Sequence, residues 1–479
     1  MSDLRSRVSK YKQIMTWLRY QIENGNYPQG ARLPSVRQLS LQFKVSLTTV
    51  LRALSELEGE DIIQSVSRSG WFVSQQASKS RNLWADFSGM EIQVNRDIVH
   101  MLTTMAESGT SPISSAVLGR DMVPDDLLRR CLVSVAKKST DVTGEYLPPP
   151  GYFPLRQRIA NLMAGRGVTC AADDIIITSG DSVAMEVALW STGEPGDLVI
   201  IEEPTYFGIL MAIEQAGFKA VPIATEPDTG LKLDYVEAVL TQRKVAAIFL
   251  NPTLQNPLGH TIPAGNRQKL VALAEQHAVT IIEDDIFSDL HPEVGRPPAI
   301  KHFETSNSVI YCSSFSKTVA PGYRVGWCVP GKHYSKVMAR MMERTLSVSS
   351  LPQQVLSDFL RRGYYMPHVG RLRDRLERCA RTIRDIVQNY FPIGTVMSSP
   401  AGGFIVWIDL PRTIDSVAFL ETAKAKGIFL PKSTIFYADG REVPSIRVCF
   451  ASADNRQVFA ELVLLGEIAH AQMRNKTLC

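Results

Sequence analysis

The chain has 479 residues, enough for roughly two to four domains and a large buried core. Apolar residues make up 45% and charged residues 21%, which excludes a mostly disordered or fibrous chain. The net charge of +4 is unevenly distributed, because residues 1–80 hold 11 Lys and Arg against 6 Asp and Glu. The other residues hold 41 basic against 42 acidic side chains. We therefore expect a small cationic module that contacts a polyanion, joined to a large neutral one.

No stretch of about 18 apolar residues occurs, so no membrane-spanning helix is expected. The N-terminus has charges but no apolar segment after them, which argues against a secretory signal. The seven cysteines are scattered without a C-x-x-C pair, so neither a disulfide framework nor a structural zinc site is expected. We predict a cytoplasmic protein with no metal centre and no membrane contact.

Residues 7–75 predict a winged helix-turn-helix. Apolar residues at helical spacing predict a first helix over 9–24. Ser35 and Ser46 are candidate N-caps of two further helices, which end at Phe43 and at about Gly59. Two β-rich runs, 62–66 and 71–73, then predict a hairpin with a polar, basic tip.

The helix that begins at Ser46 has two different faces. Val50, Leu54 and Leu57 share one face and are predicted to pack inward. The opposite face and the first turn carry short hydroxyls and one guanidinium, on Ser46, Thr48, Thr49 and Arg52. Such side chains suit phosphate and base-edge contacts in a DNA major groove. Taken singly, Arg52 and the earlier Arg37 could be solvated surface charges, but the whole pattern in a cationic segment favours DNA binding.

The run LPSVRQLSLQFKVSLTTVLRALSELEGEDII…SGWFV resembles the winged helix of GntR-type bacterial regulators. The resemblance implies DNA contacts from Arg37, Ser46, Thr48, Thr49, Arg52, Arg68, Ser69 and Gly70, of which the last three form the tip of the wing. One position departs from the family pattern, which often has a basic residue where this chain has Leu47. We expect that contact to be missing or replaced by an apolar contact with a thymine methyl group.

Residues 76–95 are polar and lack a sustained period, so they are predicted to form a linker. From residue 96 to 479, short β-rich runs alternate with helical stretches. The runs lie at 175–178, 198–201, 246–250, 280–282 and 309–311. Buried strands between helices predict a mostly parallel sheet covered by helices, with ligands beyond the C-terminal strand ends.

Five segments with chemically capable side chains follow these strand ends. They are SGDS at 179–182, EPTY at 203–206, NPTLQNPLG at 251–259, EDD at 283–285 and SSFSK at 313–317, the last followed by GYRVGW at 322–327. Each is ambiguous alone. The first suits a phosphate at a helix N-terminus but looks like many strand–helix loops. Tyr206 could be ordinary packing, and the three adjacent acids could be a solvated loop.

Together the five segments supply the roles that pyridoxal 5′-phosphate requires. Lys317 lies between small hydroxyls with Arg324 nearby in sequence, and can serve as a Schiff-base amine. Asp284 can keep a pyridine nitrogen protonated, which makes the ring an electron sink. Ser314 and Arg324 can clamp a phosphate dianion. Pyridoxal 5′-phosphate is therefore the predicted cofactor.

The same segments, with SIRVCFA at 445–451, resemble fold-type I, class-I-like aminotransferases over about 110–479. The resemblance implies that Lys317 forms the Schiff base, Asp284 pairs with the pyridinium, Asn256 faces the ring hydroxyl oxygen and Tyr206 stacks on the ring. It implies a carboxylate-binding role for Arg447. It further implies a phosphate site of Gly180, Asp181, Ser182, Ser314, Ser316 and Arg324.

The expected fold is thus an N-terminal winged helix-turn-helix followed by an α/β fold-type I aminotransferase-like domain with a smaller C-terminal α+β subdomain. The segment 146–156 resembles one that reaches the neighbouring subunit's active site in that family, which implies a homodimer. One departure concerns the Tyr usually found two or three residues after the pyridinium Asp. Ile286 and Phe287 stand there, and their lack of a phenol weakens the case for an efficient transaminase.

A GntR-like winged helix fused to an aminotransferase-like domain is the arrangement of MocR-type regulators. This resemblance implies a pyridoxal phosphate-binding transcription factor whose dimer reads two half-sites on double-stranded DNA. Its effector would be an amino compound or vitamin B6, whose binding shifts the dimer between two shapes. The alternative is a pyridoxal phosphate-dependent aminotransferase with an accessory DNA-binding module, since both need Lys317 and Asp284. A scaffold that has lost the cofactor is a third hypothesis, against which the retained site residues argue.

Overall fold

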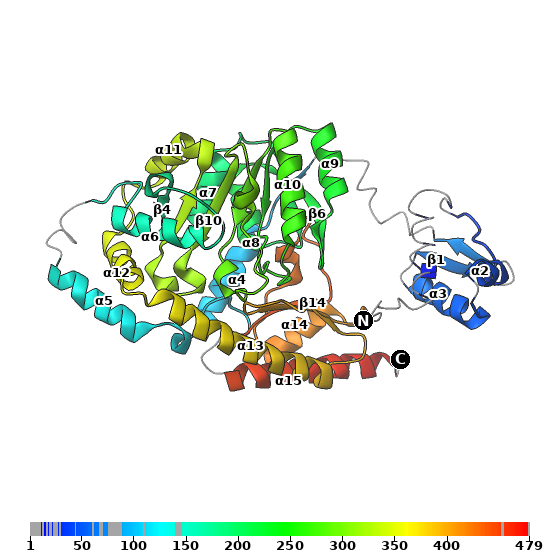
Figure 1. Ribbon diagram of the computed structural model, residues 1–479. Helices are drawn as coiled ribbons and strands as arrows, with labels where there is room; N and C mark the ends of the chain where they lie inside the picture. Colours follow the sequence, from blue (N-terminus) through cyan, green and yellow to red (C-terminus); the bar gives the residue numbers. More distant parts are fainter. Residues whose placement is uncertain are drawn as a thin grey trace, which may run out of the picture. The chain divides into compact units, whose positions relative to one another are not determined.

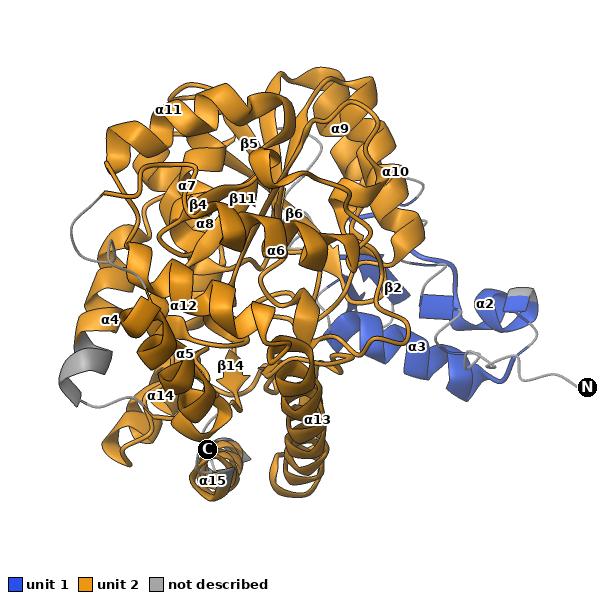
Figure 2. Cartoon of the chain, turned by 60° about the vertical axis from the view of Figure 1, so that its left-hand side comes forward, with its two compact units in different colours: residues 1–87 blue, residues 88–479 orange. Residues whose placement is uncertain are grey.

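The chain divides into two compact units, Met1–Phe87 and Ser88–Cys479, coloured separately in Figure 2. The computed structural model describes residues 11, 14, 15, 18, 22, 27, 30–43, 45–59, 62–66, 70–74, 89–108, 111–138, 146–451 and 455–477. Each unit has its own hydrophobic core.

The smaller unit is a winged helix-turn-helix, as the sequence predicts. All described positions between residues 11 and 22 are helical, and α2 (Val36–Phe43) and α3 (Leu47–Gly59) follow. Ser35 caps α2 reciprocally, since the Gln38 amide donates to Ser35 Oγ at 3.3 Å and the Ser35 amide to Gln38 Oε1 at 2.8 Å. The inward face of α3 is buried as predicted, through Val50, Leu54 and Leu57.

The wing is an antiparallel hairpin of β1 (Ile63–Val66) and β2 (Gly70–Val73). Ile63 pairs with Val73 at the base and Val66 with Gly70 at the far end. Ile63 and Val73 are buried in the core of the unit, so the hairpin is anchored at its base.

The larger unit is built on a nine-stranded sheet in the order β3-β6-β5-β8-β9-β10-β11-β4, with β7 beside β6. Figure 1 labels β4, β6 and β10 of this sheet. Neighbours from β6 to β10 are parallel, and the outer pairs are antiparallel. The strands are β3 (Met90–Glu91), β4 (Ile176–Thr178), β5 (Leu198–Glu203), β6 (Lys219–Glu226), β7 (Gly230–Leu231), β8 (Val245–Leu250), β9 (Thr280–Asp284), β10 (Val309–Ser314) and β11 (Gly326–Val329). The predicted mostly parallel sheet is confirmed, including the five predicted strands.

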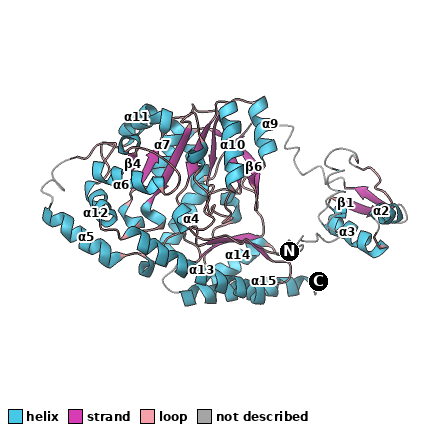
Figure 3. Cartoon of the chain, viewed as in Figure 1, coloured by secondary structure: helices cyan, strands magenta, loops and turns pink. Residues whose placement is uncertain are grey.

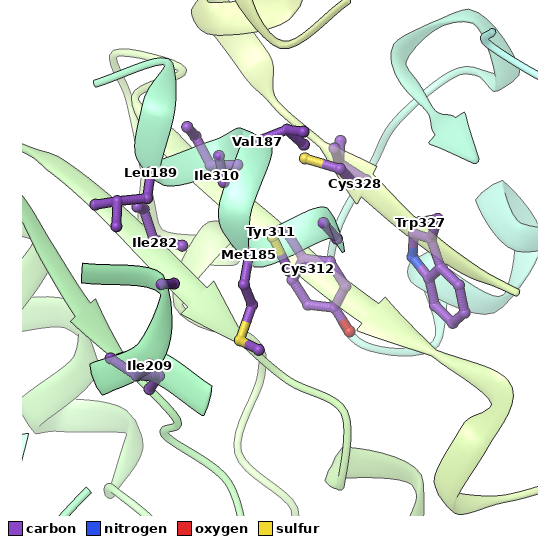
Figure 4. Close-up of a cluster of buried hydrophobic side chains, with 14 of the residues drawn as sticks. Met185, Val187, Leu189, Ile209, Ile282, Ile310, Tyr311, Cys312, Trp327 and Cys328 are labelled. Atoms are coloured by element: carbon purple, nitrogen blue, oxygen red, sulfur yellow. The ribbon is translucent and has the colours of Figure 1, made fainter. Parts of the chain in front are cut away.

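Helices surround this sheet (Figure 3). They are α4 (Asn95–Ser108), α5 (Asp125–Lys138), α6 (Phe153–Ala164), α7 (Asp181–Trp190), α8 (Phe207–Ala216), α9 (Leu233–Gln242), α10 (Ala264–Gln276), α11 (Tyr334–Arg344), α12 (Ser350–Arg361) and α13 (Tyr365–Tyr390). Figure 4 shows α7 packed across the central strands, with Met185 and Val187 near Ile310 and Cys328. Every residue of β9 and β10 is buried, as expected for strands covered on both faces.

A second, smaller sheet forms the predicted C-terminal α+β subdomain. It contains β12 (Val396–Met397), β13 (Ile405–Asp409) and β14 (Ser445–Cys449), paired antiparallel in that order. Helices α14 (Ser416–Ala425) and α15 (Asn455–Thr477) complete it, and α15 lies beside α13 (Figure 1). This sheet carries Arg447 on its edge strand β14.

The start of the larger unit lies inside the segment 76–95 that we predicted to be a linker. Strand β3 pairs antiparallel with β6, and Ile92 and Val94 are buried in the main core. Residues 90–94 therefore belong to the larger unit, because two apolar side chains in a polar segment were enough to anchor it. Among the described residues, no helix is both long and apolar enough to cross a bilayer. The six cysteines of the described part are free thiols.

Candidate functional site

The strand ends of the large sheet converge on a cavity of about 240 Å³. Strands β4, β5, β8, β9 and β10 all point their C-terminal ends to the same edge, because β4 and β10 both run antiparallel to β11. Nine of the eleven side chains predicted for the cofactor and carboxylate line this cavity: Asp181, Ser182, Tyr206, Asn256, Asp284, Ser316, Lys317, Arg324 and Arg447. The other two, Gly180 and Ser314, are not among its lining residues.

At one end of the cavity a cation meets the start of α7. Gly180 is the N-cap, with φ +86°, and Asp181 and Ser182 form the first turn. A Cβ added at Gly180 would lie 2.3 Å from Arg324 Nη2, so only glycine lets that guanidinium approach. A helix N-terminus beside an arginine is suited to bind a phosphate dianion.

Ser314 acts on the backbone rather than on the cavity. Its Oγ accepts a hydrogen bond from the Ser316 amide at 3.2 Å and caps the short helix Phe315–Lys317. That turn directs Ser316 and Lys317 to the cavity. Gly326 is needed nearby, because a Cβ there would lie 2.6 Å from the Gly180 carbonyl carbon.

Two carboxyl groups face each other in the middle of the cavity wall. Asp181 is 5% and Asp284 2% exposed. Burial raises the pKa of Asp181 to about 6. Burial, and then the charge of Asp181, raises the pKa of Asp284 well above its usual value. The pair therefore retains a proton near neutral pH, unless a cationic group is placed beside it.

The three adjacent acids at 283–285 are not a solvated loop, because each is buried and has its own surroundings. Glu283 accepts the amides of Ile300 at 2.6 Å and Lys301 at 3.0 Å. Asp285 accepts from Thr253 Oγ1 at 2.7 Å and from the Tyr311 hydroxyl at 2.9 Å. Only Asp284 faces the cavity.

Asn256 is held in the cavity wall by a second asparagine. Asn251 Oδ1 accepts from the Asn256 amide at 3.0 Å, and its side-chain NH₂ donates to the Asp284 carbonyl. Sequence reasoning missed this role of Asn251, although it begins the same Asn-Pro loop. Burial raises the pKa of Tyr206, which lines the same wall, to about 12, so its phenol stays protonated.

The segment 111–119, which we call the strap, contacts two of the cations that line the cavity, Lys317 and Arg447. Lys317 Nζ donates to the Ala116 carbonyl at 2.7 Å, and Arg447 Nη2 donates to the Ser114 carbonyl. The Cys449 amide on β14 donates to the Ile113 carbonyl at 2.8 Å. Burial lowers the pKa of Lys317, while its neighbours Cys449 and Arg447 act in opposite directions. Sequence reasoning missed the strap, which has no distinctive residues.

Several buried polar atoms in this wall have no hydrogen-bond partner within the described part of the chain. They are Asp181 Oδ1, Asn256 Oδ1 and Arg447 Nε. Unpaired buried polar atoms cost free energy, so a wall with three of them is suited to a polar ligand. A pyridinium ring with a hydroxyl and a phosphate matches the lining of this cavity, since Asp284 can offer an anion to the ring nitrogen, the Asn256 side chain a hydrogen bond to the ring oxygen, and Arg324 a cation to the phosphate.

The positions after Asp284 are apolar, as the sequence indicates. Ile286 and Phe287 are 8% and 3% exposed and line the cavity. The Ile286 amide donates to Asp284 Oδ1 at 3.2 Å, and Phe287 packs edge-on against Phe404 with ring centroids 5.6 Å apart. At positions 286 and 287 the wall therefore has apolar side chains and no phenol, and the Ile286 N–H is already used by Asp284.

In the smaller unit, the polar face of α3 is open to solvent. Ser46 and Thr48 are exposed, and Ser46 Oγ lies 2.8 Å from the hydroxyls of both Thr48 and Thr49. The Arg52 guanidinium lies 4.2 Å from the Tyr11 ring centroid and 4.0 Å from Glu56.

Of the other predicted DNA contacts, Arg37 and Gly70 are exposed. Arg68 and Ser69, at the tip of the wing, lie outside the described residues. Leu47, where the family often has a basic residue, is 47% exposed, and Leu51 one turn later is 43% exposed.

Comparisons with known proteins agree with the folds of both units. A family model of class I and II aminotransferases matches residues 118–462, and a model of bacterial regulatory proteins of the gntR family matches residues 10–73.

Two similar proteins come from Escherichia coli (strain K12). The chain is 32% identical over 474 residues to the uncharacterized HTH-type transcriptional regulator YjiR, covering 97% of this chain and 100% of YjiR. It is 34% identical over 411 residues to the uncharacterized HTH-type transcriptional regulator YdcR, covering 85% of this chain and 88% of YdcR.

Among solved structures, the chain is similar to Pyrococcus horikoshii kynurenine aminotransferase, crystallised with PMP, KYN and KYA. The TM-score is 0.72 at 26% identity, and the match covers 78% of this chain and 94% of that one.

Proposed function

The chain belongs to the MocR-type GntR regulators, because it joins a GntR domain to a class I and II aminotransferase domain. We propose that it binds pyridoxal 5′-phosphate in the cavity and DNA through α3. An amino compound or the vitamin itself is its effector, and a homodimer reads two half-sites.

One observation supports the binding of pyridoxal phosphate most directly. A lysine whose pKa is lowered by burial shares a cavity with two facing carboxyl groups and with an arginine at a helix N-terminus. When bound, pyridoxal phosphate supplies an electron sink for a covalently attached amine. The chain's own residues would hold it: Lys317 offers the amine, Asp284 keeps the ring nitrogen protonated, and Arg324 and Ser316 bind the phosphate.

The cofactor is tested by absorbance of the full-length protein mixed with pyridoxal phosphate. We expect a near-visible band that becomes fixed to the protein on borohydride reduction. Lys317→Ala should lack the reducible species, whereas the control Lys269→Ala, an exposed lysine on α10, should retain it. A wild-type protein that binds no pyridoxal phosphate would refute the proposal.

DNA binding is supported by the open polar face of α3 and by the cationic N-terminal segment. Phosphate contacts release counterions, so affinity for DNA from the gene's own promoter region should fall steeply with salt. Thr48→Ala should weaken binding to the preferred sequence, while Ser55→Ala, an exposed hydroxyl farther along α3, serves as the matched control. Binding that is absent or independent of salt would contradict this part.

The same cavity residues would also serve an aminotransferase. The apolar pair Ile286 and Phe287 and the attached GntR domain favour the regulator. The two functions are separated by adding amino acids to the cofactor-loaded protein with and without a keto-acid acceptor. A spectral change without turnover supports a sensor, and rapid turnover supports the enzyme.

A further inference from the structure

The wall of the cavity that remains for an effector is mainly apolar. Beyond the residues assigned to the cofactor, the described lining consists of the small residues 114–116 and of the apolar Met101, Leu102, Val117, Phe207, Ile286 and Phe287. None of these side chains is charged. Ser114 Oγ is already used, because it donates to the Phe429 carbonyl.

Charged groups in the described lining are few, and most have an assigned partner. Asp181 and Asp284 face each other, Arg324 lies against Gly180, and Lys317 is the amine. Arg447 is the remaining cation. It is 4% exposed, it donates through Nη2 to the Ser114 carbonyl, and its buried Nε has no hydrogen-bond partner among the described residues.

An arginine with one unpartnered buried donor matches one carboxylate. Within the described lining that this chain contributes, a second carboxylate or a second ammonium on the same ligand would face apolar side chains and Ser115. An unpaired charge in such surroundings is strongly unfavourable. The same wall would instead gain free energy by covering methyl, methylene or ring groups.

We propose that the effector is an α-amino acid with an uncharged, mainly apolar side chain, its carboxylate on Arg447 and its side chain against Met101, Leu102 and Val117. The inference rests on the proposed function, because it takes the cavity to be the cofactor and effector site. Dicarboxylic amino acids, diamines and amines without a carboxylate are therefore poor effectors.

The test uses full-length protein loaded with pyridoxal phosphate. Leucine, methionine and phenylalanine are compared with aspartate, glutamate, lysine and γ-aminobutyrate. Two readouts are followed, the absorbance of the bound cofactor and the midpoint of thermal unfolding. We expect half-saturation by at least one apolar amino acid at a concentration at least tenfold lower than by any charged one. Equal or stronger responses to the charged compounds, or to γ-aminobutyrate, would overturn the inference.

A charge placed on the wall should reverse this preference. Leu102 is 46% exposed, so Leu102→Arg is compatible with folding, and it adds a cation for a second carboxylate. We expect the variant to lose response to leucine and to gain response to aspartate or glutamate, at least tenfold in each case. Val417→Arg, on the 51% exposed Val417 of α14 outside the cavity, is the matched control and should keep the wild-type preference.

These outcomes separate the two proposals. If no cofactor band forms, the proposed function fails. If the band forms and responds to charged amino acids as readily as to apolar ones, or if Leu102→Arg leaves the preference unchanged, only the assignment of the effector class fails.

Discussion

Replacing Asp284 with asparagine should weaken the binding of pyridoxal phosphate and, at the same time, stabilise the cofactor-free protein. Asparagine keeps the volume of the side chain and can still accept from the Ile286 amide. Its NH₂ can donate to Asp181 as a protonated Asp284 would. What it removes is the negative charge opposite a pyridinium nitrogen.

The size of the first effect follows from that lost charge. A hydrogen bond between charged groups contributes about 1.5–3 kcal/mol, so the dissociation constant for pyridoxal phosphate should rise roughly 10- to 150-fold. Titrating cofactor-free protein with pyridoxal phosphate at pH 7.5 measures this directly. Asp234→Asn, an exposed acid in the first turn of α9, controls for a change in net charge.

The second effect has a sign set by the raised pKa of Asp284. An acid whose pKa is higher in the folded than in the unfolded state destabilises the fold increasingly as pH rises above its unfolded value, near 4. For its neighbour Asp181, a rise from 3.8 to about 6 corresponds to about 3 kcal/mol above pH 6. The melting temperature of the variant should therefore exceed that of wild type by a margin that grows from pH 5 to pH 8.

The reasoning is refuted if Asp284→Asn binds pyridoxal phosphate within threefold of wild type. A margin in melting temperature that shrinks as pH rises would also contradict it. Together the two measurements distinguish the loss of a ligand contact from a general loss of structure, because the latter would lower both affinity and stability.

Three further predictions concern other parts of the chain. Gly180→Ala should lower the affinity for pyridoxal phosphate at least tenfold, because the added Cβ would lie 2.3 Å from Arg324 Nη2. Unchanged affinity in the same titration would contradict this. Asp289→Asn should lower the free energy of unfolding by about 3–5 kcal/mol in urea titrations, because it leaves the buried Arg166 without its carboxylate. Burial would raise the pKa of Asp289, but the charge of Arg166 outweighs burial and holds that pKa below its usual value. The stabilisation by the Asp289–Arg166 pair is therefore present above about pH 4 and is lost at lower pH. Replacing thymine by uracil in the preferred DNA should weaken DNA binding by the wild-type protein but not by Leu47→Ala, because Leu47 is exposed. Equal losses of affinity in both proteins would show that Leu47 contacts no thymine methyl group.

The cofactor side of the cavity could be predicted from the sequence because its residues follow strand ends. A parallel sheet gathers those ends at one edge, so local segments separated by many residues meet without any knowledge of side-chain contacts. Alternation along an extended backbone also explains why Asp284 faces the cavity while Glu283 and Asp285 have other partners. The sequence-based hypothesis of a solvated acidic loop failed because it ignored that alternation.

The strap could not be predicted in the same way. The contact of Ala116 with Lys317 joins residues 201 positions apart, and that of Ser114 with Arg447 joins residues 333 apart. No period or composition marks such contacts. Likewise, the edge strand β3 and the buried Ile92 and Val94 lay in a segment whose average polarity indicated a linker, because two buried apolar residues hardly change an average.

The strap contacts both cations through main-chain oxygens, which every amino acid carries. Substitutions at Ser114 or Ala116 therefore leave these two acceptors in place. Its length is a different matter. The Ile113 carbonyl is bound to the Cys449 amide and the Gly119 amide to the Ala451 carbonyl, so the residues between these two anchors span a fixed gap. An insertion or deletion between the two anchors would therefore displace both acceptors, whereas a change of side chain at Ala116 would leave them in place.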